Sequence, residues 1–367
     1  MRKLASIQKI ERIDPIPGRD QIGLALVEGW HVIVRYDQFL PGDLCIYVEI
    51  DSVMPEREEY EFLRSKNFRI RTMKMAGVIS QGICFPLSFL PDNGGIPYEL
   101  GQDVTDLLGV KKYDEYEEQK PRRQEEKQSP LRRFLFRHRL TRPLARLVWQ
   151  GTKREKAGFP DEVAKTDETR IQVMPWVLEG TTAGLKYDVR EKVDGQSATY
   201  LLRKRRGLDR LLGQYEFVVC SRNFALPEDD SSYWQMARLY DIEGVLRKIV
   251  GKYEWICLQG ECVGPKIQGN PYNLRQNDLY CFNLIYPDGK LEGSIAEPYL
   301  SGYGLKWVPL VDKEFTLPAT VDEMVAYATG QSKINPDVLR EGVVVRNYSK
   351  NISFKAVSNE YLLKHGK

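Results

Sequence analysis

The sequence predicts two domains of different fold class: an all-β barrel over residues 1–108 and an α+β domain with antiparallel sheets over residues 160–367. Three observations support this. The chain has 367 residues, which is comfortable for two domains. Its first part contains closely spaced apolar runs separated by Gly and Pro, which is typical of a small barrel. Its last part mixes strand and helix patterns without a regular βαβ alternation, which favours antiparallel sheets.

Short strands account for most of the N-terminal part. An alternating run over residues 21–36 is broken by Glu28-Gly29 and therefore predicts two strands. Pro41 and Gly42 form a turn before the strand at 44–50. Residues 68–85 then predict another pair of strands around Ala76-Gly77.

Three cations in that last pair are candidate nucleic-acid contacts. Arg69 and Arg71 are two positions apart and are expected on one strand face, with Lys74 close behind them. A solvated outer face is the more common explanation of this pattern, and a phosphate-binding face is the alternative. The residues alone leave both open.

Residues 109–159 are expected to form a charged linker and helical segment. Residues 111–127 carry charges of both signs with few apolar side chains. Residues 127–154 contain no Asp or Glu, and their arginines are interleaved with aromatic residues. Pro143 is expected to divide this segment into two short helices. It could bind a polyanion or dock on its own domain, and we give both equal weight.

Strands and helices are expected to intermix in the C-terminal part. Helical patterns cover residues 231–251 and 320–330. Strand-like runs cover residues 184–193, 197–204, 215–223, 255–264, 278–286, 341–348 and 351–358.

Composition excludes several classes of protein. The net charge is only +3, and no apolar run is long enough to span a membrane. The N-terminus lacks the apolar block of a secretion signal. Six scattered cysteines without a Cys-x-x-Cys pair indicate reduced thiols in a cytoplasmic protein. Three distant histidines argue against a zinc site or a histidine-based nucleophile.

A series of motifs in the second domain indicates chemistry. Residues 190–200 read REKVDGQSATY and place Lys192, Asp194 and Gly195 in a Lys-x-Asp-Gly arrangement. Further polar or aromatic residues follow at the edges of predicted strands: Arg222, Glu261, Phe282, Glu341 and Lys355. Each motif alone has a structural explanation, such as a turn, a core phenylalanine or a surface lysine. Their joint occurrence in this order is far more specific.

The motif set resembles the covalent nucleotidyltransferase superfamily, which comprises ATP-dependent ligases and RNA capping enzymes. The runs AKTDETRIQ, CSRN, GECVGPKIQGNPY, REGVVVRN and SFKAVSNEYLLK are similar to the RNA ligase 2 type. An N-terminal barrel with little chain after the last motif is similar to the Deinococcus-type branch, which carries an OB-like module before its nucleotidyltransferase domain. The chain departs from the phage RNA ligase 2 pattern at Ser353, where a lysine is expected, and in lacking a C-terminal domain.

The resemblance implies an ATP-dependent RNA ligase with Mg²⁺ as the metal and Mn²⁺ as an alternative. Lys192 would attack ATP to form lysyl-AMP, AMP would pass to a 5′-phosphate, and a 3′-hydroxyl would complete the phosphodiester bond. Because a free lysine is almost wholly protonated at pH 7, the first step requires an environment that removes a proton.

The resemblance also implies roles for the other motif residues. Lys355 would bind the α-phosphate, and Glu341 would orient or ligate a mostly hydrated metal ion. Phe282 would stack on adenine, Glu261 would bind the ribose, and Arg222 would contact ribose or phosphate. Asp194 would have a structural or sealing role, and Gly195 would shape the turn. Five residues before the nucleophile are candidates for the rim of the nucleotide pocket, although structural roles are favoured for them: Lys165, Thr166, Asp167, Glu168 and Arg170.

The expected partner is nicked duplex RNA or an RNA/DNA hybrid, bound without sequence preference by a monomer in RNA repair. A capping-type guanylyltransferase or a DNA ligase is the alternative of related chemistry. Capping enzymes carry their OB module after the nucleotidyltransferase domain, so the order of domains argues against them. A nucleic-acid-binding protein on a degenerate ligase scaffold is the non-enzyme alternative, and the intact motif set argues against it.

Overall fold

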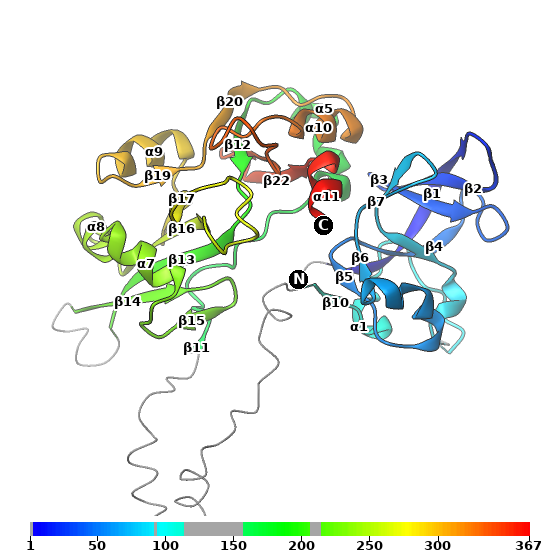
Figure 1. Cartoon of the computed structure of the whole chain (residues 1–367), viewed down its shortest axis with the longest axis horizontal. Helices are drawn as coiled ribbons and strands as arrows, with labels where there is room; N and C mark the ends of the chain where they lie inside the picture. The colour runs from blue at the N-terminus through cyan, green and yellow to red at the C-terminus, as the bar shows by residue number, and fades with distance from the viewer. Residues whose placement is uncertain (1–2, 92–93, 114–156, 206–213) are drawn as a thin grey trace, which may run out of the picture.

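The computed structural model describes residues 3–91, 94–113, 157–205 and 214–367. Two domains lie side by side, the first drawn in blue to cyan and the second in green to red (Figure 1). The predicted basic segment lies outside the described residues. The fold class expected from the sequence is confirmed.

The first domain is a curled arrangement of short antiparallel strands. Its main sheet has the order β3-β2-β1-β4-β9 and is formed by β1 (Ala5–Ile16), β2 (Arg19–Val27), β3 (Trp30–Arg35), β4 (Leu44–Val48) and β9 (Ile83–Phe85). A second sheet, β10-β5-β6, contains β5 (Ser52–Val53), β6 (Arg69–Ile70) and β10 (Lys111–Lys112). A hairpin pairs β7 (Met73–Met75) with β8 (Val78–Ser80).

Alternating burial along these strands builds the first core. Trp30 is fully buried on β3, as are Ile7 and Ile10 on β1. Short helices close the ends of the barrel: η1 (Glu58–Lys66), η2 (Leu87–Phe89) and α1 (Thr105–Leu108).

The chain around residue 70 is more broken than the sequence predicts. The expected strand pair at 68–85 is divided among β6, β7, β8 and β9. The strand β10 pairs with β5, so the first domain's second sheet includes residues beyond 108.

The second domain contains two sheets, which are antiparallel except for the parallel pair β17–β19. The larger follows β11-β15-β14-β13-β16-β17-β18, with β19 beside β17; its strands are β11 (Ala157–Gly158), β13 (Gln196–Lys204), β14 (Tyr215–Cys220), β15 (Phe224–Leu226), β16 (Trp255–Val263), β17 (Asp278–Tyr286), β18 (Gly289–Lys290) and β19 (Lys306–Trp307). The smaller has the order β20-β12-β21-β22, formed by β12 (Tyr187–Lys192), β20 (Leu310–Phe315), β21 (Gly342–Asn347) and β22 (Ile352–Val357).

Helices cover the sheets and the edge of the second domain. The expected helix at 231–251 is two helices, because Asp241 between them adopts a left-handed φ of 45°. The helical elements are η3 (Ile171–Val173), η4 (Pro175–Leu178), α5 (Gly180–Ala183), α7 (Ser232–Leu239), α8 (Ile242–Ile249), α9 (Gly293–Ser301), α10 (Val321–Ala328) and α11 (Asn359–His365). Among the described residues, no helix is long and apolar enough to cross a membrane.

Direct contacts join the two domains. The Gly29 N–H donates to the Gln172 carbonyl over 2.9 Å. The His31 ring lies 3.0 Å from the Asp322 carboxylate. The helix α11 lies on the side that faces the first domain (Figure 1), and its Leu362 belongs to the first domain's core.

Candidate active site

A cavity of about 1100 Å³ lies where the two sheets of the second domain meet the first domain. The motif residues of the second domain line it together: Lys192, Asp194, Gly195, Arg222, Glu261, Phe282, Glu341 and Lys355. They come from loops and from strands of both sheets, so the fold of the whole second domain brings them to one place.

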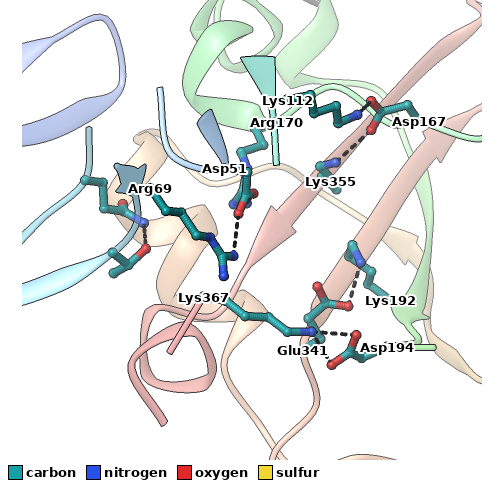
Figure 2. Close-up of polar contacts among 12 residues, drawn as sticks. Asp51, Arg69, Lys112, Asp167, Arg170, Lys192, Asp194, Glu341, Lys355 and Lys367 are labelled. Atoms are coloured by element: carbon teal, nitrogen blue, oxygen red, sulfur yellow. Dashed lines mark hydrogen bonds and ion pairs between the residues drawn. The ribbon is translucent and has the colours of Figure 1, made fainter. Parts of the chain in front are cut away.

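Lys192 lies at the end of β12, opposite Gly342 on β21. Glu341 immediately precedes Gly342 in the chain, so this register puts Glu341 beside Lys192. Lys192 Nζ donates to Glu341 Oε2 over 2.5 Å (Figure 2). The Lys192 side chain is 25% exposed and therefore accessible from the cavity, whereas Glu341 is 10% exposed.

Asp194 is held firmly beside the nucleophile. Its carboxylate accepts from Tyr361 Oη over 2.7 Å and from Lys367 Nζ over 2.6 and 2.7 Å. Its backbone N–H donates to Tyr272 Oη over 2.7 Å. The loop after Lys192 is thus fixed by side chains from distant parts of the second domain.

Gly195 lies at a bend between β12 and β13, and it is not among the residues with a left-handed φ. A glycine is needed at this position because the chain there passes very close to β16. A Cβ at this position would lie 2.2 Å from the Cys262 carbonyl oxygen and 3.0 Å from Glu261 Cγ. Glycine therefore allows the nucleophile loop to pack against β16.

Glu261 and Phe282 face the cavity from β16 and β17. Burial, followed by the nearby carboxylates of Glu341 and Asp194, raises the pKa of Glu261 to about 8, although Lys192 opposes the shift. The strands that carry Glu261 and Phe282 pair with a bulge between Gln259 and Gly260. Phe282 is half-buried, which leaves part of its ring toward the cavity.

Asp167 gathers three cations at the rim of the cavity, and Figure 2 shows two of them, Lys112 and Lys355. Its carboxylate lies 2.6 Å from Lys112 Nζ, 3.1 Å from Lys355 Nζ and 3.6 Å from Arg222 Nη2. Burial alone would raise the pKa of Asp167, but Lys355 and Lys112 hold it well below its usual range. Lys355 and Arg222 therefore meet at one carboxylate.

Ser353, which occupies the place of an expected lysine, lies near another cation. Its hydroxyl donates to Glu168 over 2.7 Å. The same glutamate accepts from Arg346 over 2.7 Å, and Arg346 also lines the cavity. Burial and the neighbouring Arg346 lower the pKa of Lys290, another lining residue, to about 8.

The first domain's predicted cations lie apart from one another. Arg69 is not on a solvated outer face: it lines the cavity, pairs with Asp51 at 3.3 Å and stacks 3.6 Å from the Tyr113 ring centroid. Arg71 follows the end of β6 and is half-buried, whereas Lys74 is exposed on β7. Arg69 and Arg71 therefore do not form one strand face.

Sequence reasoning missed several residues at this site. Lys112 and Lys367 belong to no motif. Arg346 lies in a strand-like run, and the sequence does not show whether its side chain points into the cavity or away from it. Asp167 and Glu168, for which a structural role was favoured over a place at the pocket rim, line the cavity and contact its cations. No group of three or more His, Cys, Asp or Glu side chains that could hold a metal was found in the described ranges.

Comparisons with known proteins agree with this geometry. Residues 4–87 match a family model described as an OB-fold domain, and residues 186–358 match the model of the RNA ligase family. No curated protein matches the chain significantly.

Solved structures match over the full length. A Naegleria gruberi RNA ligase with PPi is 28% identical, with a TM-score of 0.78 and coverage of 100% of this chain and 99% of that chain. A glutamate-to-alanine mutant of it with ATP and Mn is 29% identical, with a TM-score of 0.77 and complete coverage of both chains, 100% and 100%. A lysine-to-methionine mutant with AMP and Mn gives 28% identity, a TM-score of 0.78 and coverage of 100% and 99%.

The second domain therefore matches the RNA ligase family over residues 186–358, and the first domain matches an OB-fold domain over residues 4–87. The family match, the fold and the nucleotide-bound relatives support ATP-dependent RNA ligation with a divalent metal.

Proposed function

We propose that this chain is an ATP-dependent RNA ligase that seals 3′-hydroxyl/5′-phosphate nicks in duplex RNA or an RNA/DNA hybrid, in RNA repair. The observation that carries the proposal is the Lys192–Glu341 pair of 2.5 Å inside a cavity of about 1100 Å³. A partly accessible lysine held by a carboxylate and surrounded by further cations is suited to attack a phosphoanhydride.

In the first step, Lys192 Nζ attacks the α-phosphorus of ATP. A phosphorus–nitrogen bond forms, the bond to the β-phosphate oxygen breaks, and pyrophosphate leaves. Glu341 accepts a hydrogen bond from the lysine, so its carboxylate orients the amine and is positioned to take up a proton from it.

The cations at the rim supply the charge that the phosphate oxygens need. Lys355 and Arg222 lie at the Asp167 carboxylate, and ATP would compete with that carboxylate for them. Phe282 would stack on the adenine ring from β17. Glu261 keeps its proton at neutral pH in the nucleotide-free protein, so it can donate as well as accept a hydrogen bond at the ribose.

In the second and third steps the same cations serve a new phosphate. The 5′-phosphate of the nucleic acid attacks the adenylate on Lys192, which forms a phosphate–phosphate anhydride and releases the lysine amine. The 3′-hydroxyl then attacks the activated 5′-phosphate, a phosphodiester bond forms, and AMP leaves.

The site could hold a divalent metal ion with Glu341 as its carboxylate ligand. Glu341 is the carboxylate that would hold Mg²⁺ or Mn²⁺, with water and phosphate oxygens completing its coordination, because the described residues offer no three-carboxylate cluster. The mutual repulsion of Glu261, Glu341 and Asp194, which raises the pKa of Glu261, is compatible with a cation at this place. When bound, such a metal would neutralise phosphate charge.

The nucleic acid would be bound by both domains. Lys74 is exposed on the β7–β8 hairpin and is available for backbone contacts, whereas Arg69 and Arg71 are nearer to the cavity and the chain's C-terminal helix. The basic segment at 127–154 is a further proposed contact on sequence grounds. We also propose that the enzyme acts as a monomer in the cytoplasm, where its six free cysteines would stay reduced.

Covalent labelling tests the proposal. The full chain is incubated with α-³²P-ATP or α-³²P-GTP and Mg²⁺, beside Lys192→Met and the matched control Lys248→Met, whose lysine is exposed on α8. Label from ATP in the wild type and the control, and none in Lys192→Met, is the expected result. Label from GTP would support capping chemistry instead. Absence of label on folded, AMP-free protein would overturn the proposal that the chain is an enzyme.

The substrate is tested with matched nicks. Nicked duplex RNA, an RNA/DNA hybrid and duplex DNA of one sequence are each offered to the adenylated enzyme. Sealing of the RNA-containing nicks is expected, and sealing of DNA alone would identify a DNA ligase. Size-exclusion chromatography of the same preparation tests the monomer.

A further inference from the structure

The helix α11 connects the first domain's core with the nucleophile loop. Leu362 is 2% exposed and packs in the hydrophobic core of the first domain. The neighbouring Tyr361, 1% exposed, donates its hydroxyl proton to Asp194 Oδ2 over 2.7 Å. One turn of helix therefore contacts both the OB-fold domain and a carboxylate two residues from Lys192.

Lys367 reaches the same carboxylate from beyond the helix. Gly366 adopts a left-handed φ of 65°, which ends the helix and turns the chain back. Lys367 Nζ then lies 2.7 Å from Asp194 Oδ1 and 2.6 Å from Oδ2, so both oxygens are engaged (Figure 2). The two side chains are only 18% and 7% exposed.

The backbone of Lys367 is itself anchored. Its N–H donates to the Leu362 carbonyl over 2.9 Å, and its carbonyl accepts from the Thr72 N–H of the first domain over 3.2 Å. The ammonium is therefore fixed between α11, the first domain and Asp194, and its geometry depends on all three.

The positive charge of Lys367 offsets negative charge at the site. Asp194, Glu341 and Glu261 are close enough to repel one another, as the raised pKa of Glu261 reflects after the larger effect of burial. Without Lys367, the buried Asp194 carboxylate would lose its cation and would be left beside the negative phosphates of ATP. Within the described ranges, the side-chain hydrogen bond left to this carboxylate would be the one from the Tyr361 hydroxyl.

We propose that Lys367 is a positioning residue for the adenylyl transfer on Lys192. It fixes the Asp194 carboxylate in one place and neutralises it, and thereby sets the shape of the 192–195 loop. The inference rests on the proposed function and adds a residue that no sequence motif contains.

The test compares single-turnover lysyl-AMP formation in the full chain. Lys367→Met removes the charge and keeps the aliphatic stem, Lys367→Arg keeps the charge, and Lys364→Met is the matched control from an exposed lysine on α11. We expect the rate constant of Lys367→Met to fall about 10- to 100-fold with little change in the ATP concentration for half-saturation. Lys367→Arg should recover most of the rate, and Lys364→Met should equal the wild type.

A double-mutant cycle identifies the partner. In an Asp194→Asn background, Lys367→Met should cause little further loss, because both substitutions break the same contact. Wild-type rates in Lys367→Met, or losses that multiply in the double mutant, would overturn the positioning role. Thermal unfolding of each variant separates this from a folding defect, because the rates are compared at a temperature at which every variant remains folded.

Failure of the proposed ligase function would give a different result from failure of the Lys367 proposal. If the wild-type chain forms no lysyl-AMP at all, the ligase proposal is overturned and the positioning role with it. If the wild type labels and Lys367→Met labels equally fast, only the role of Lys367 is lost.

Discussion

Asp51 of the first domain and Arg170 of the second form an ion pair of 3.1 Å across the domain boundary. The same carboxylate lies 3.3 Å from Arg69, so one acid faces two guanidinium groups (Figure 2). Within the described part of the chain, Arg170 Nε and Nη1 and Arg69 Nε are buried without a hydrogen-bond partner. The domain boundary therefore has an excess of positive charge that depends on Asp51.

Replacing Asp51 should weaken the association of the domains. In Asp51→Asn, two largely buried arginines would face each other without a counter-charge, and we expect a loss of about 3 kcal/mol in the free energy of unfolding. Urea unfolding of the full chain measures it. Asp37→Asn is the control, because its pair with Arg35 is exposed and should contribute nothing measurable. Equal stability of the two variants would contradict the role of Asp51.

Asp167 should oppose the binding of ATP. In Asp167→Asn, Lys355, Lys112 and Arg222 lose their shared carboxylate and become available to phosphate oxygens. Removing one negative charge near a polyanion should strengthen ATP binding about 3- to 10-fold. Calorimetric titration with ATP in a Lys192→Met background measures binding without reaction.

The free energy of unfolding should decrease in Asp167→Asn, because the three cations then repel one another. Glu216→Gln, on an exposed glutamate that pairs with Arg203, is the control for both measurements. Weaker ATP binding in Asp167→Asn would contradict this prediction. It would mean that Asp167 orients the cations for ATP rather than competing for them.

The sequence predicts the fold class well, for a physical reason. Strand alternation and Gly/Pro turns are local signals, and the motif residues lie within strands or beside them, so the folding of those strands brings them to one cavity. Lys192 and Glu341 are 149 positions apart, yet their contact follows once β12 pairs with β21.

Contacts that depend on packing between domains could not be predicted in this way. Lys112 comes from the first domain and meets Asp167 of the second, and no local pattern marks Lys112. Lys367 is 173 positions from Asp194 and reaches it only because Gly366 turns the chain after α11. Arg69 was expected on a strand face that the early end of β6 removes.

Gly195 should not tolerate a methyl group. In Gly195→Ala, the new Cβ would lie 2.2 Å from the Cys262 carbonyl oxygen on β16, so one of the two strands must move. We expect a loss of at least about 2 kcal/mol in stability and a large loss of lysyl-AMP formation. Thermal unfolding and ³²P labelling measure the two effects.

Gly184→Ala is the matched control for that substitution. Its Cβ would meet nothing within 4 Å, and its φ of −81° suits any residue. It should keep wild-type stability and labelling. If Gly195→Ala behaves in the same way, the close approach of the nucleophile loop to β16 is not required.

Glu261 should make the nucleotide-free protein less stable as the pH rises. Its pKa is about 8 in the folded protein, raised from 4.5 first by burial and then by Glu341 and Asp194. Between pH 4.5 and 8 the folded chain keeps a proton that the unfolded chain has lost, so raising the pH favours unfolding. This unfavourable effect is absent below pH 4.5 and complete above pH 8.

Glu261→Gln removes that dependence, because an amide cannot ionise. The free energy of unfolding of the variant minus that of the wild type should therefore increase from pH 5 to pH 9, by about 1–3 kcal/mol for a half-buried side chain. Urea unfolding at each pH measures it. Glu314→Gln, on an exposed strand position, should give a difference that does not change with pH. A flat difference for Glu261→Gln would mean that the carboxylate is already ionised at neutral pH, and that Glu261 could then only accept hydrogen bonds from the ribose.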